Sequence, residues 1–305
     1  TAPIFRNAQE AVLVRTIYRR HKTVADWQAR LGVPQTPFNM ANDSYLFVPF
    51  DPEGFSRLMP LLEGKHIGAF NWRAARGTDR NAEDVVAAES GALRRPDWYG
   101  VVRHYVPTAV VRDRYPGDFR LVYRKITNAT NERTSIAGVA PPVAVGDTLT
   151  MFSRGDAECA LYCVTALNSF AYDFIARVRM SGTSLTHWIV RQIPMPTWPE
   201  AGSPIDKAFV DCRAAELVLS DYWLCDALRG CSWAGPPFVW DEGRRFALRC
   251  ELDAAFFHLY LPMGADGGWR ALEGETDQSL AQLRGTFASP RDAVSYILDT
   301  FPIVR

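Results

Sequence analysis

The sequence lacks the short motifs that mark the common catalytic centres. Its 305 residues contain no glycine-rich phosphate loop, no paired-histidine metal motif and no nucleophile elbow. The five histidines are isolated from one another, so each is expected to be a surface or core residue rather than a general base. These absences exclude the familiar hydrolase, nucleotidase and metalloprotease signatures, and we expect no catalytic or cofactor-binding residue in this chain.

Long apolar runs and a cysteine framework are also missing. No run approaches the roughly 18 to 20 apolar residues that a membrane helix needs, and the N-terminus shows no signal-peptide pattern. The six cysteines are scattered among apolar residues, which is typical of reduced thiols. Cys159 and Cys163 share a helical face but lack a second pair or a nearby histidine, so we expect no zinc site. The sequence predicts a cytoplasmic protein with no membrane partner.

The chain as a whole has no net charge, but two of its segments carry a surplus of charge of one sign. The 34 basic residues balance 34 acidic ones, so the total charge predicts no nucleic-acid partner. Residues 103–133, however, contain seven basic residues against three acidic ones. Residues 241–299 lean the other way. A basic middle and an acidic tail cancel in the sum.

Hydrophobic periodicity predicts an α+β fold. We expect a mixed α/β domain over residues 1–200 and a helical domain over residues 201–305, joined by the proline-rich segment 194–204. The expected strands are Tyr45–Phe50, 101–111, 119–126, Leu149–Phe152 and Trp188–Ile193. The expected helices are an Asn7-capped helix ending near Arg20, Ala157–Met180, Lys207–Leu228, Glu242–Tyr260 and one that Ser289-Pro290 opens.

Residues 120–134 are the most distinctive segment, because they begin as a strand and end in a cluster of Asn, Thr and Arg. Arginine forms bidentate bonds to guanine or phosphate, and asparagine pairs with the edge of adenine. Hydroxyls and loop amides fix the phosphate backbone. Asn and Thr also stabilise ordinary solvated turns, which is the alternative interpretation. The predicted DNA contacts here are Arg124, Lys125, Asn128, Thr130, Asn131, Arg133 and Thr134.

Two further segments are candidates for binding an anion. In residues 61–73, Lys65 and Arg73 could face phosphates, although a strand with a basic exposed face is the simpler interpretation. Ser181-Gly182-Thr183 follows a long apolar helix, and its hydroxyls and amides suit an anion. Helix termination by glycine explains the same residues.

Taken in order, several segments resemble the C-terminal target-recognition region of large adenine-specific DNA methyltransferases. Such enzymes belong to restriction–modification systems and to related phage-defence systems of the BREX and DISARM kind. The similarity runs through Pro3-Ile4-Phe5-Arg6, Asn42-Asp43-Ser44, Gly64-Lys65-His66-Ile67, Ala129-Thr130-Asn131-Glu132-Arg133-Thr134, Leu167-Asn168-Ser169-Phe170, Ser181-Gly182-Thr183, Ile193-Pro194-Met195-Pro196, Pro236-Pro237-Phe238-Val239-Trp240, Arg249-Cys250-Glu251-Leu252-Asp253-Ala254 and Tyr296-Ile297-Leu298-Asp299-Thr300-Phe301-Pro302. The chain departs from this pattern at Asn71-Trp72-Arg73, where relatives often carry Asp-His-Arg.

The resemblance implies that the chain reads and grips double-stranded DNA for chemistry performed elsewhere. In this family a catalytic domain with an Asn-Pro-Pro-aromatic motif binds S-adenosylmethionine and methylates an extruded adenine. Pro141-Pro142 and Pro236-Pro237 lack the preceding Asn, so no catalytic role transfers to them. An upstream methyltransferase domain, and possibly other defence-system subunits, are therefore the expected partners beside DNA.

Two other classes of function stay open at the level of sequence. The chain could be a protein-interaction scaffold whose acidic helical C-terminus docks a nuclease, a translocase or another defence subunit. It could also be a hydrolase with an unrecognised site. An upstream reading frame that encodes the cofactor loop and the Asn-Pro-Pro-aromatic motif would exclude the hydrolase.

Overall fold

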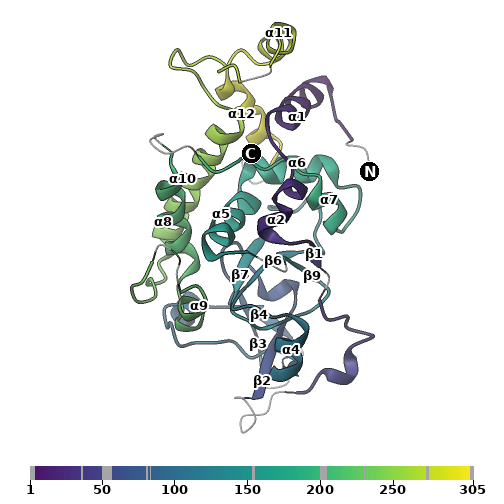
Figure 1. Ribbon diagram of the computed structural model, residues 1–305, viewed down its shortest axis with the longest axis vertical. Helices are drawn as coiled ribbons and strands as arrows, with labels where there is room; N and C mark the ends of the chain where they lie inside the picture. Colours follow the sequence, from purple (N-terminus) through teal and green to yellow (C-terminus); the bar gives the residue numbers. More distant parts are fainter. Residues whose placement is uncertain are drawn as a thin grey trace.

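The computed structural model describes residues 4–35, 37–49, 57–79, 82, 84–152, 155–199, 205–229, 231, 233–272 and 275–302. Within these ranges every strand lies before residue 153, and the segments after it form helices (Figure 1). The α+β class that the sequence predicts is therefore confirmed.

The described strands are short and form three small sheets. They are β1 (Pro34–Gln35), β2 (Leu58–Leu62), β3 (Ala75–Gly77), β4 (Val85–Ala87), β5 (Tyr105–Pro107), β6 (Arg120–Arg124), β7 (Ala137–Ala140), β8 (Ala144–Val145) and β9 (Leu149–Phe152). The main sheet has the order β1-β9-β6-β7 and is antiparallel. The second sheet places β2 between β5 and β8, and β3 pairs with β4. The predicted strands at 119–126 and Leu149–Phe152 are thus present as β6 and β9.

The helices fall into two groups along the chain. Those of the mixed part are α1 (Ala8–Arg20), α2 (Gln28–Leu31), α3 (Ser90–Leu93), α4 (Thr108–Arg114), α5 (Ala157–Asn168), α6 (Phe170–Arg179) and α7 (His187–Arg191), with 3-10 turns at η1 (Val24–Trp27), η2 (Ser44–Leu46) and η4 (Gly64–His66). Those of the C-terminal part are α8 (Lys207–Val218), α9 (Tyr222–Ala227), α10 (Glu242–Tyr260), α11 (Asp277–Thr286) and α12 (Pro290–Asp299). Figure 1 shows this second group along one side and the top of the molecule.

The single helix expected over Ala157–Met180 is instead two helices, α5 and α6, bent by 64°. Ser169 lies at the bend, and its side chain caps the start of α6. Asn168 lies just before it and forms two hydrogen bonds of 2.9 Å with the backbone of Ala137 in β7. The bend therefore exists because the Ser169 side chain caps α6 and the Asn168 side chain binds the sheet. An uninterrupted helix would leave both side chains without these hydrogen bonds.

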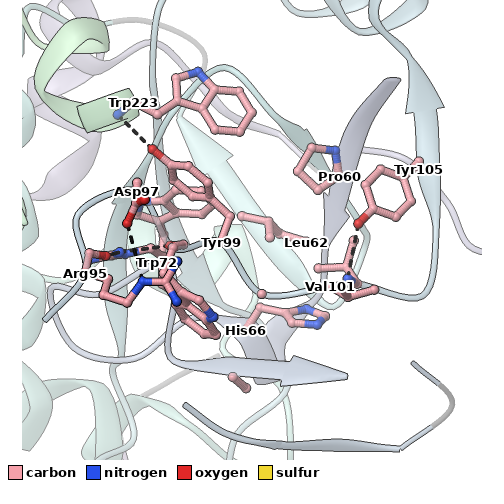
Figure 2. Close-up of a pocket in the computed structure, with 15 residues that line it drawn as sticks. Pro60, Leu62, His66, Trp72, Arg95, Asp97, Tyr99, Val101, Tyr105 and Trp223 are labelled. Carbon is pink, nitrogen blue, oxygen red and sulfur yellow. Dashed lines mark hydrogen bonds and ion pairs between the residues drawn. The ribbon is translucent and has the colours of Figure 1, made fainter. Parts of the chain in front are cut away.

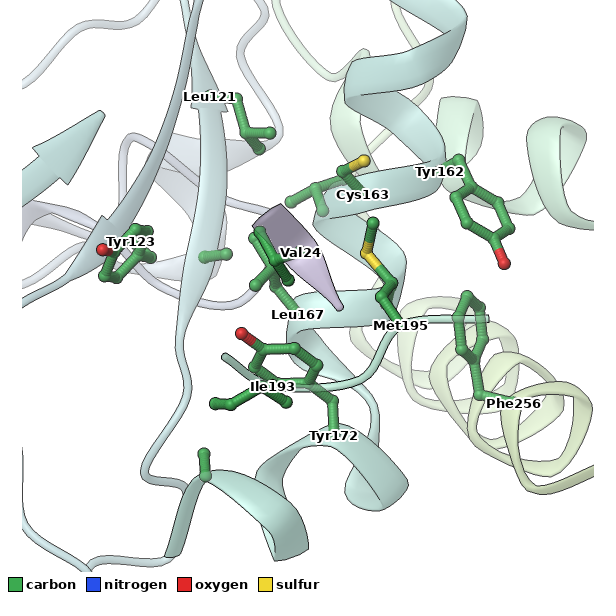
Figure 3. Packing of buried hydrophobic residues seen from close by; sticks show 14 of the residues in the cluster. Val24, Leu121, Tyr123, Tyr162, Cys163, Leu167, Tyr172, Ile193, Met195 and Phe256 are labelled. Atoms are coloured by element: carbon green, nitrogen blue, oxygen red, sulfur yellow. The ribbon is translucent and has the colours of Figure 1, made fainter. Parts of the chain in front are cut away.

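Helix α5 lies at the centre of the main hydrophobic cluster (Figure 3). On one side it faces the main sheet, from which Leu121 points toward it. On the other side Tyr162 packs against Phe256 of α10, with ring centroids 5.6 Å apart. From Cys159 to Asn168 every residue of α5 is buried, in agreement with the apolar character of this segment in the sequence.

Two predicted strands in the mixed part are wrong, and a third is much shorter than expected. Residues 188–191 belong to α7, and the turn that follows carries Ile193 to the i, i+3 position from Val190, where both are buried. Tyr45–Phe50 begins as the turn η2 and forms only a bridge from Val48, while Phe50 lies outside the described residues. Of residues 101–111, Tyr105–Pro107 form β5, residues 108–111 belong to α4, and residues 101–104 form neither a strand nor a helix.

The C-terminal helices agree with the sequence except at one point. Glu242–Tyr260 and the helix that Ser289-Pro290 opens are present as α10 and α12, each with its capping residue in place. Lys207–Leu228 is divided into α8 and α9, because Asp221 caps the second helix and accepts a hydrogen bond from the Leu224 N–H at 2.9 Å.

The main hydrophobic cluster contains residues from both sides of the expected domain boundary. Helix α8 packs against α5, α10 packs against α6, and α11 packs against α1. The boundary itself falls at residues 200 and 201, outside the described residues, so the two-domain division stays a prediction. Among the described helices none alone has the length and apolar character to cross a membrane, and only the bent pair α5–α6 does so jointly.

Candidate nucleic-acid interface

The structure brings together two segments that the sequence singles out separately. The backbone N–H of Thr127 donates to the carbonyl of Thr183 at 3.0 Å, and Ile126 forms a β-bridge with Ser184. The Leu185 N–H also donates to the Lys125 carbonyl at 2.7 Å. Because of this pairing, the polar loop after β6 and the Ser-Gly-Thr segment after α6 form one surface.

Seven of the predicted DNA contacts lie on this surface. Six of them are exposed, and Lys125 is half-buried. We call these residues the polar face: Lys125, Asn128, Thr130, Asn131, Ser181, Gly182 and Thr183. Its side chains are hydroxyls, amides and one ammonium, which are the groups that bind phosphate and base edges.

The tip of the loop is a tight turn that uses part of its own polar groups. The Asn128 side-chain oxygen accepts from the N–H and from the hydroxyl of Thr130, both at 3.0 Å. The Asn131 N–H donates to the Asn128 carbonyl at 3.2 Å. This is the turn chemistry that the alternative interpretation of the sequence predicts, and it fixes the shape of the loop.

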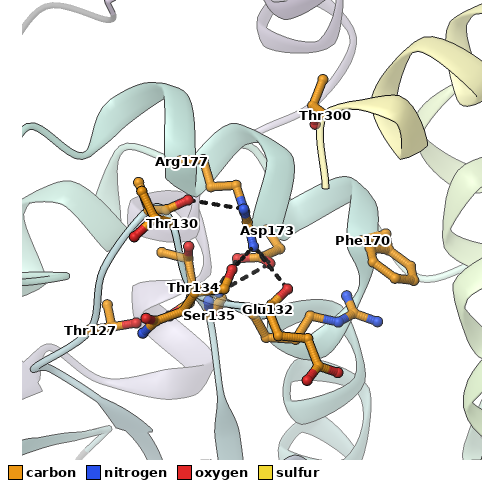
Figure 4. Close-up of polar contacts among 12 residues, drawn as sticks. Thr127, Thr130, Glu132, Thr134, Ser135, Phe170, Asp173, Arg177 and Thr300 are labelled. Carbon is orange, nitrogen blue, oxygen red and sulfur yellow. Dashed lines mark hydrogen bonds and ion pairs between the residues drawn. The ribbon is translucent and has the colours of Figure 1, made fainter. Parts of the chain in front are cut away.

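Asp173 of α6 holds the base of the loop. Its carboxylate accepts from the N–H of Thr134 at 3.0 and 3.1 Å and from the N–H of Ser135 at 2.7 Å (Figure 4). Burial raises the pKa of the Asp173 carboxyl, and the neighbouring Arg177 guanidinium opposes that rise. Three backbone hydrogen bonds and one cation satisfy a carboxylate that is fully buried.

Arg177 of α6 holds the tip of the same loop. Its guanidinium donates to the carbonyls of Ala129 at 2.9 Å, Asn131 at 2.7 Å and Glu132 at 2.9 Å. It also pairs with Asp173, at 3.4 Å between Nη2 and Oδ2. One turn of α6 therefore fixes both the base and the tip of the loop. This sets the position of the exposed side chains of the loop before any ligand binds.

Three other predicted contacts have structural partners in this molecule. Arg73 is 2% exposed and donates to the carbonyls of Trp98 and Ser220, so it joins the mixed part to α9 and does not face solvent. Thr134 is buried, and its hydroxyl donates to the Asn128 carbonyl at 3.0 Å. Arg124 is half-buried and donates through Nε to the Ile67 carbonyl at 2.6 Å. Arg73 and Thr134 are therefore held inside the molecule and Arg124 is partly used within it, and their contact with DNA stays a prediction.

Arg133 leaves the polar loop toward the C-terminal part. Its guanidinium lies 3.3 Å from the centroid of the Phe170 ring and forms an ion pair with Asp253 of α10 at 3.0 Å. The other Asp253 carboxylate oxygen accepts the Phe170 N–H at 2.8 Å. Arg133 therefore links the loop to α10, and this link competes with any contact to phosphate.

Lys65 is exposed and lies on the turn η4, close to the polar face. The Gly64 N–H donates to the Thr148 hydroxyl at 2.8 Å, and the Lys125 N–H donates to the Thr148 carbonyl at 3.0 Å. Both basic segments thus meet at one residue at the start of β9. The Lys65 ammonium pairs with Glu63 at 3.2 Å, which reduces the local positive charge.

An exposed aromatic beside the polar face was missed at the level of sequence. Trp188 is 62% exposed, and the Arg191 guanidinium lies 5.7 Å from its ring centroid. Ile126 is 54% exposed, and its β-bridge to Ser184 places it on the same surface. Burial lowers the pKa of the His187 imidazole, and the cationic Arg191 and Lys125 lower it further. Residues 188–193 were expected to be a strand, whereas Trp188 lies on α7 and its side chain is exposed.

Metal ligands are not clustered in the described part of the chain. No group of three or more His, Cys, Asp or Glu side chains there could hold a metal ion. The Cys159 and Cys163 thiols lie 3.9 Å apart within the core. The chemistry that this surface supports is binding by hydrogen bonds and positive charge.

The similarity that comparison with known proteins finds is structural and distant. No protein-family model and no curated protein matches the chain. Solved structures similar to it include the Type IIL restriction–modification enzyme MmeI in complex with DNA, at 11% sequence identity and a TM-score of 0.38. The matched region covers 86% of this chain and 36% of that enzyme, so the chain spans about a third of the length of this structural neighbour.

Proposed function

We propose that the chain is the DNA target-recognition and binding module of a larger S-adenosylmethionine-dependent adenine-specific DNA methyltransferase. The parent enzyme would act in the cytoplasm, in a restriction–modification or related phage-defence system. The observation that carries this proposal is the pairing of Thr127 with Thr183, because it joins two predicted DNA-contact segments into one exposed surface. Double-stranded DNA is the partner that this surface fits.

The polar face suits a duplex in its chemistry and in its rigidity. Lys125 and Arg191, whose charges both act on His187, supply positive charge for phosphates. Exposed Asn131 has an amide that can bind a base edge, and the hydroxyls of Ser181 and Thr183 can bind the backbone. Because Asp173 and Arg177 already fix the loop, binding would cost little further ordering of its backbone.

Methyl transfer itself is assigned to another part of the parent enzyme. The sequence holds neither the glycine-containing cofactor loop nor the Asn-Pro-Pro-aromatic motif of that chemistry. No residue of this chain is proposed as a ligand of S-adenosylmethionine. The upstream methyltransferase domain is proposed as a covalent partner of this module.

A titration of the purified chain with short duplexes at rising salt tests the proposal. Neutralisation of phosphates by the polar face predicts binding at about 50 mM salt that weakens linearly on a logarithmic scale toward about 200 mM. Absence of binding at low salt, or binding without a salt slope, would exclude direct DNA contact by this chain. A chain that fails this test but co-purifies with another defence subunit would support the scaffold alternative.

The scaffold alternative rests on the acidic surplus of residues 241–299. Some of these carboxylates have partners within the chain: Glu251 pairs with Arg213, Asp253 with Arg133 and Glu275 with Arg20. The pairs of Asp253 and Glu275 hold the C-terminal part onto the mixed part, and the pair of Glu251 joins α10 to α8. On the polar face the Thr130 hydroxyl donates to Asn128, but the Ser181 and Thr183 hydroxyls form no hydrogen bond within the described part of the chain. For this reason we favour DNA.

A further inference from the structure

A pocket with aromatic walls lies apart from the polar face, between the second sheet and α9 (Figure 2). Its volume is about 450 Å³, within the range of small-molecule sites. Its lining includes Pro60, Leu62, His66, Tyr99, Tyr105 and Trp223. Nothing in the proposed recognition of a duplex by the polar face requires this pocket.

Three aromatic side chains form one wall. Trp72 and Tyr99 stack with ring centroids 5.8 Å apart and planes inclined by 29°. Trp223 meets both rings edge-on, at 5.8 Å from each centroid. Figure 2 shows Pro60 and Tyr105 across the pocket from this wall. Flat apolar walls on two sides favour a flat ligand that stacks against them.

Hydrogen bonds hold this wall in place. The Trp72 indole N–H donates to the Asp221 carboxylate at 2.8 Å. The Trp223 backbone N–H donates to the Tyr99 hydroxyl at 3.2 Å, and a hydroxyl that accepts one bond can still donate another. The wall is therefore formed before a ligand arrives, which is a property of built binding sites.

His66 supplies a buried donor at the base of the pocket. Its Nδ1 accepts the Glu63 N–H at 3.0 Å, so the ring proton of the neutral imidazole lies on Nε2. Among the described residues Nε2 has no hydrogen-bond partner, and the residue is 1% exposed. Figure 2 shows the imidazole below Leu62, among the side chains that line the pocket. A buried N–H without a partner favours a ligand that brings an acceptor to it.

The charged groups near the pocket are already paired. The Arg73 guanidinium donates to the carbonyls of Arg95 and Trp98 and pairs with Asp221, at 3.6 Å between Nε and Oδ2. Arg95 and Asp97, which are exposed, pair with each other at 3.6 Å. With these charges balanced, the pocket suits a neutral ligand better than an anion.

From these observations we infer that the pocket binds a nucleobase, as a neutral, planar heteroaromatic group whose ring nitrogen or carbonyl accepts the His66 N–H. A base stacks on aromatic side chains and presents hydrogen-bond acceptors at its edge. Two sources share this chemistry: a free nucleoside, and a base swung out of a nucleic-acid strand. The inference holds for a free nucleoside whether or not the polar face binds DNA.

The first arm of the test uses free nucleosides. Adenosine, guanosine, cytidine and thymidine are titrated separately into the full chain by calorimetry, up to about 5 mM, which reaches weak affinities. We expect saturable binding of at least one of them at one site per chain. Trp223→Ala should weaken it about tenfold or more, because stacking is lost. Tyr45→Ala, which removes an exposed aromatic ring outside the pocket, is the control and should leave the affinity unchanged.

The second arm uses a base within DNA. A duplex with 2-aminopurine opposite an abasic site reports an extruded base by its fluorescence, and the increase should be lost in Trp223→Ala but kept in Tyr45→Ala. A second variant, Val101→Trp, fills the pocket instead of opening it and should block both ligands. It keeps the test valid if Trp223→Ala does not fold.

Binding in the first arm alone identifies a free nucleoside, and a response in the second arm alone identifies a base of DNA. No saturable binding in either arm, or equal binding by Trp223→Ala, Val101→Trp and the unaltered chain, would overturn the inference.

Discussion

The Arg177 guanidinium donates to the backbone carbonyl of Asn131 at 2.7 Å, from a helix that begins 39 residues later in the sequence. It binds the Ala129 and Glu132 carbonyls in the same way. Without this contact the tip of the loop would be held by its own Asx turn, while Asp173 and Thr183 hold the base. The long-range contact changes this loop from a solvated turn into a surface of fixed shape.

Replacement of Arg177 should therefore release the loop without unfolding the chain. In Arg177→Met three charge-assisted hydrogen bonds are lost, and we expect a loss of about 2 to 4 kcal/mol in the free energy of unfolding. Hydrogen–deuterium exchange should rise in residues 128–132 more than elsewhere. The control is Arg284→Met, an exposed arginine on α11. Unchanged exchange in the loop would show that its shape does not depend on Arg177.

Arg133 and Asp253 should couple as a structural pair. Removal of either partner leaves a largely buried charge without its counter-ion, so Arg133→Met and Asp253→Asn should each cost about 2 to 4 kcal/mol of stability. In a double-mutant cycle the two losses should not add. Urea unfolding of the four proteins measures the coupling.

DNA binding by Arg133→Met also distinguishes a structural role of Arg133 from a role in DNA recognition. If Arg133 is structural, the salt slope of DNA binding in Arg133→Met should match that of the unaltered chain. A slope reduced by about one would instead assign Arg133 to phosphate, as the sequence suggests. Additive losses in the cycle would likewise contradict the structural role.

Lys125 should contribute to DNA binding and little to stability. Its ammonium belongs to the polar face, and no ion pair involving it occurs among the described residues. Lys125→Ala should weaken binding to all duplexes about equally and reduce the salt slope by about one. Arg112→Ala on α4, which lies at the lower end of Figure 1 away from α6 and α7, is the matched control. Equal effects of the two substitutions would indicate general charge attraction rather than contact at the polar face.

His66 should make the chain less stable in mild acid. Burial lowers the pKa of its imidazole to about 4, whereas the unfolded chain has the ordinary value near 6.5. Between these two pH values the His66 imidazole is protonated in the unfolded state but not in the folded state. The contribution of His66 to the free energy of unfolding is therefore fully present above pH 6.5 and is lost as the pH falls toward 4. The loss from this residue is about 3 kcal/mol.

Comparison with His66→Gln isolates this contribution, because glutamine offers an acceptor to the Glu63 N–H but does not titrate. Free energies of unfolding measured at pH 7, 6, 5 and 4 give the pH dependence of stability for the unaltered chain and for His66→Gln. Other groups, such as His21 with its lowered pKa and Asp173 with its raised pKa, titrate in both proteins and cancel. Parallel pH profiles of the two proteins would contradict the assignment.

Local signals in the sequence predicted the elements whose caps and periodicity agree. Asn7 before α1, Asp241 before α10 and Ser289 before α12 each accept the hydrogen bond that their type predicts. Strands β6 and β9 have the expected positions. These elements were predictable because capping and side-chain periodicity act within a few residues.

The errors occurred where distant parts of the chain compete with local preference. Ser169 and Asp221 cap new helices inside segments that read as continuous, and Trp72 binds Asp221 from 149 residues away. An apolar run such as 188–193 does not distinguish a short strand from a short helix. Only the packing of Val190 and Ile193 into one core selects the helix.

The sequence by itself determined the α+β class, the main helices and the polar character of the loop after β6. Tertiary structure decided which polar residues reach solvent. Arg73 and Arg133 are drawn to carbonyls and to Asp253, because a cation that leaves water needs partners fixed by the fold. Lys125 and Thr183 stay on the surface, and the pairing of two distant segments makes them neighbours. The amino-acid composition gives the number of charged residues, whereas the fold determines which of them are buried and which are exposed.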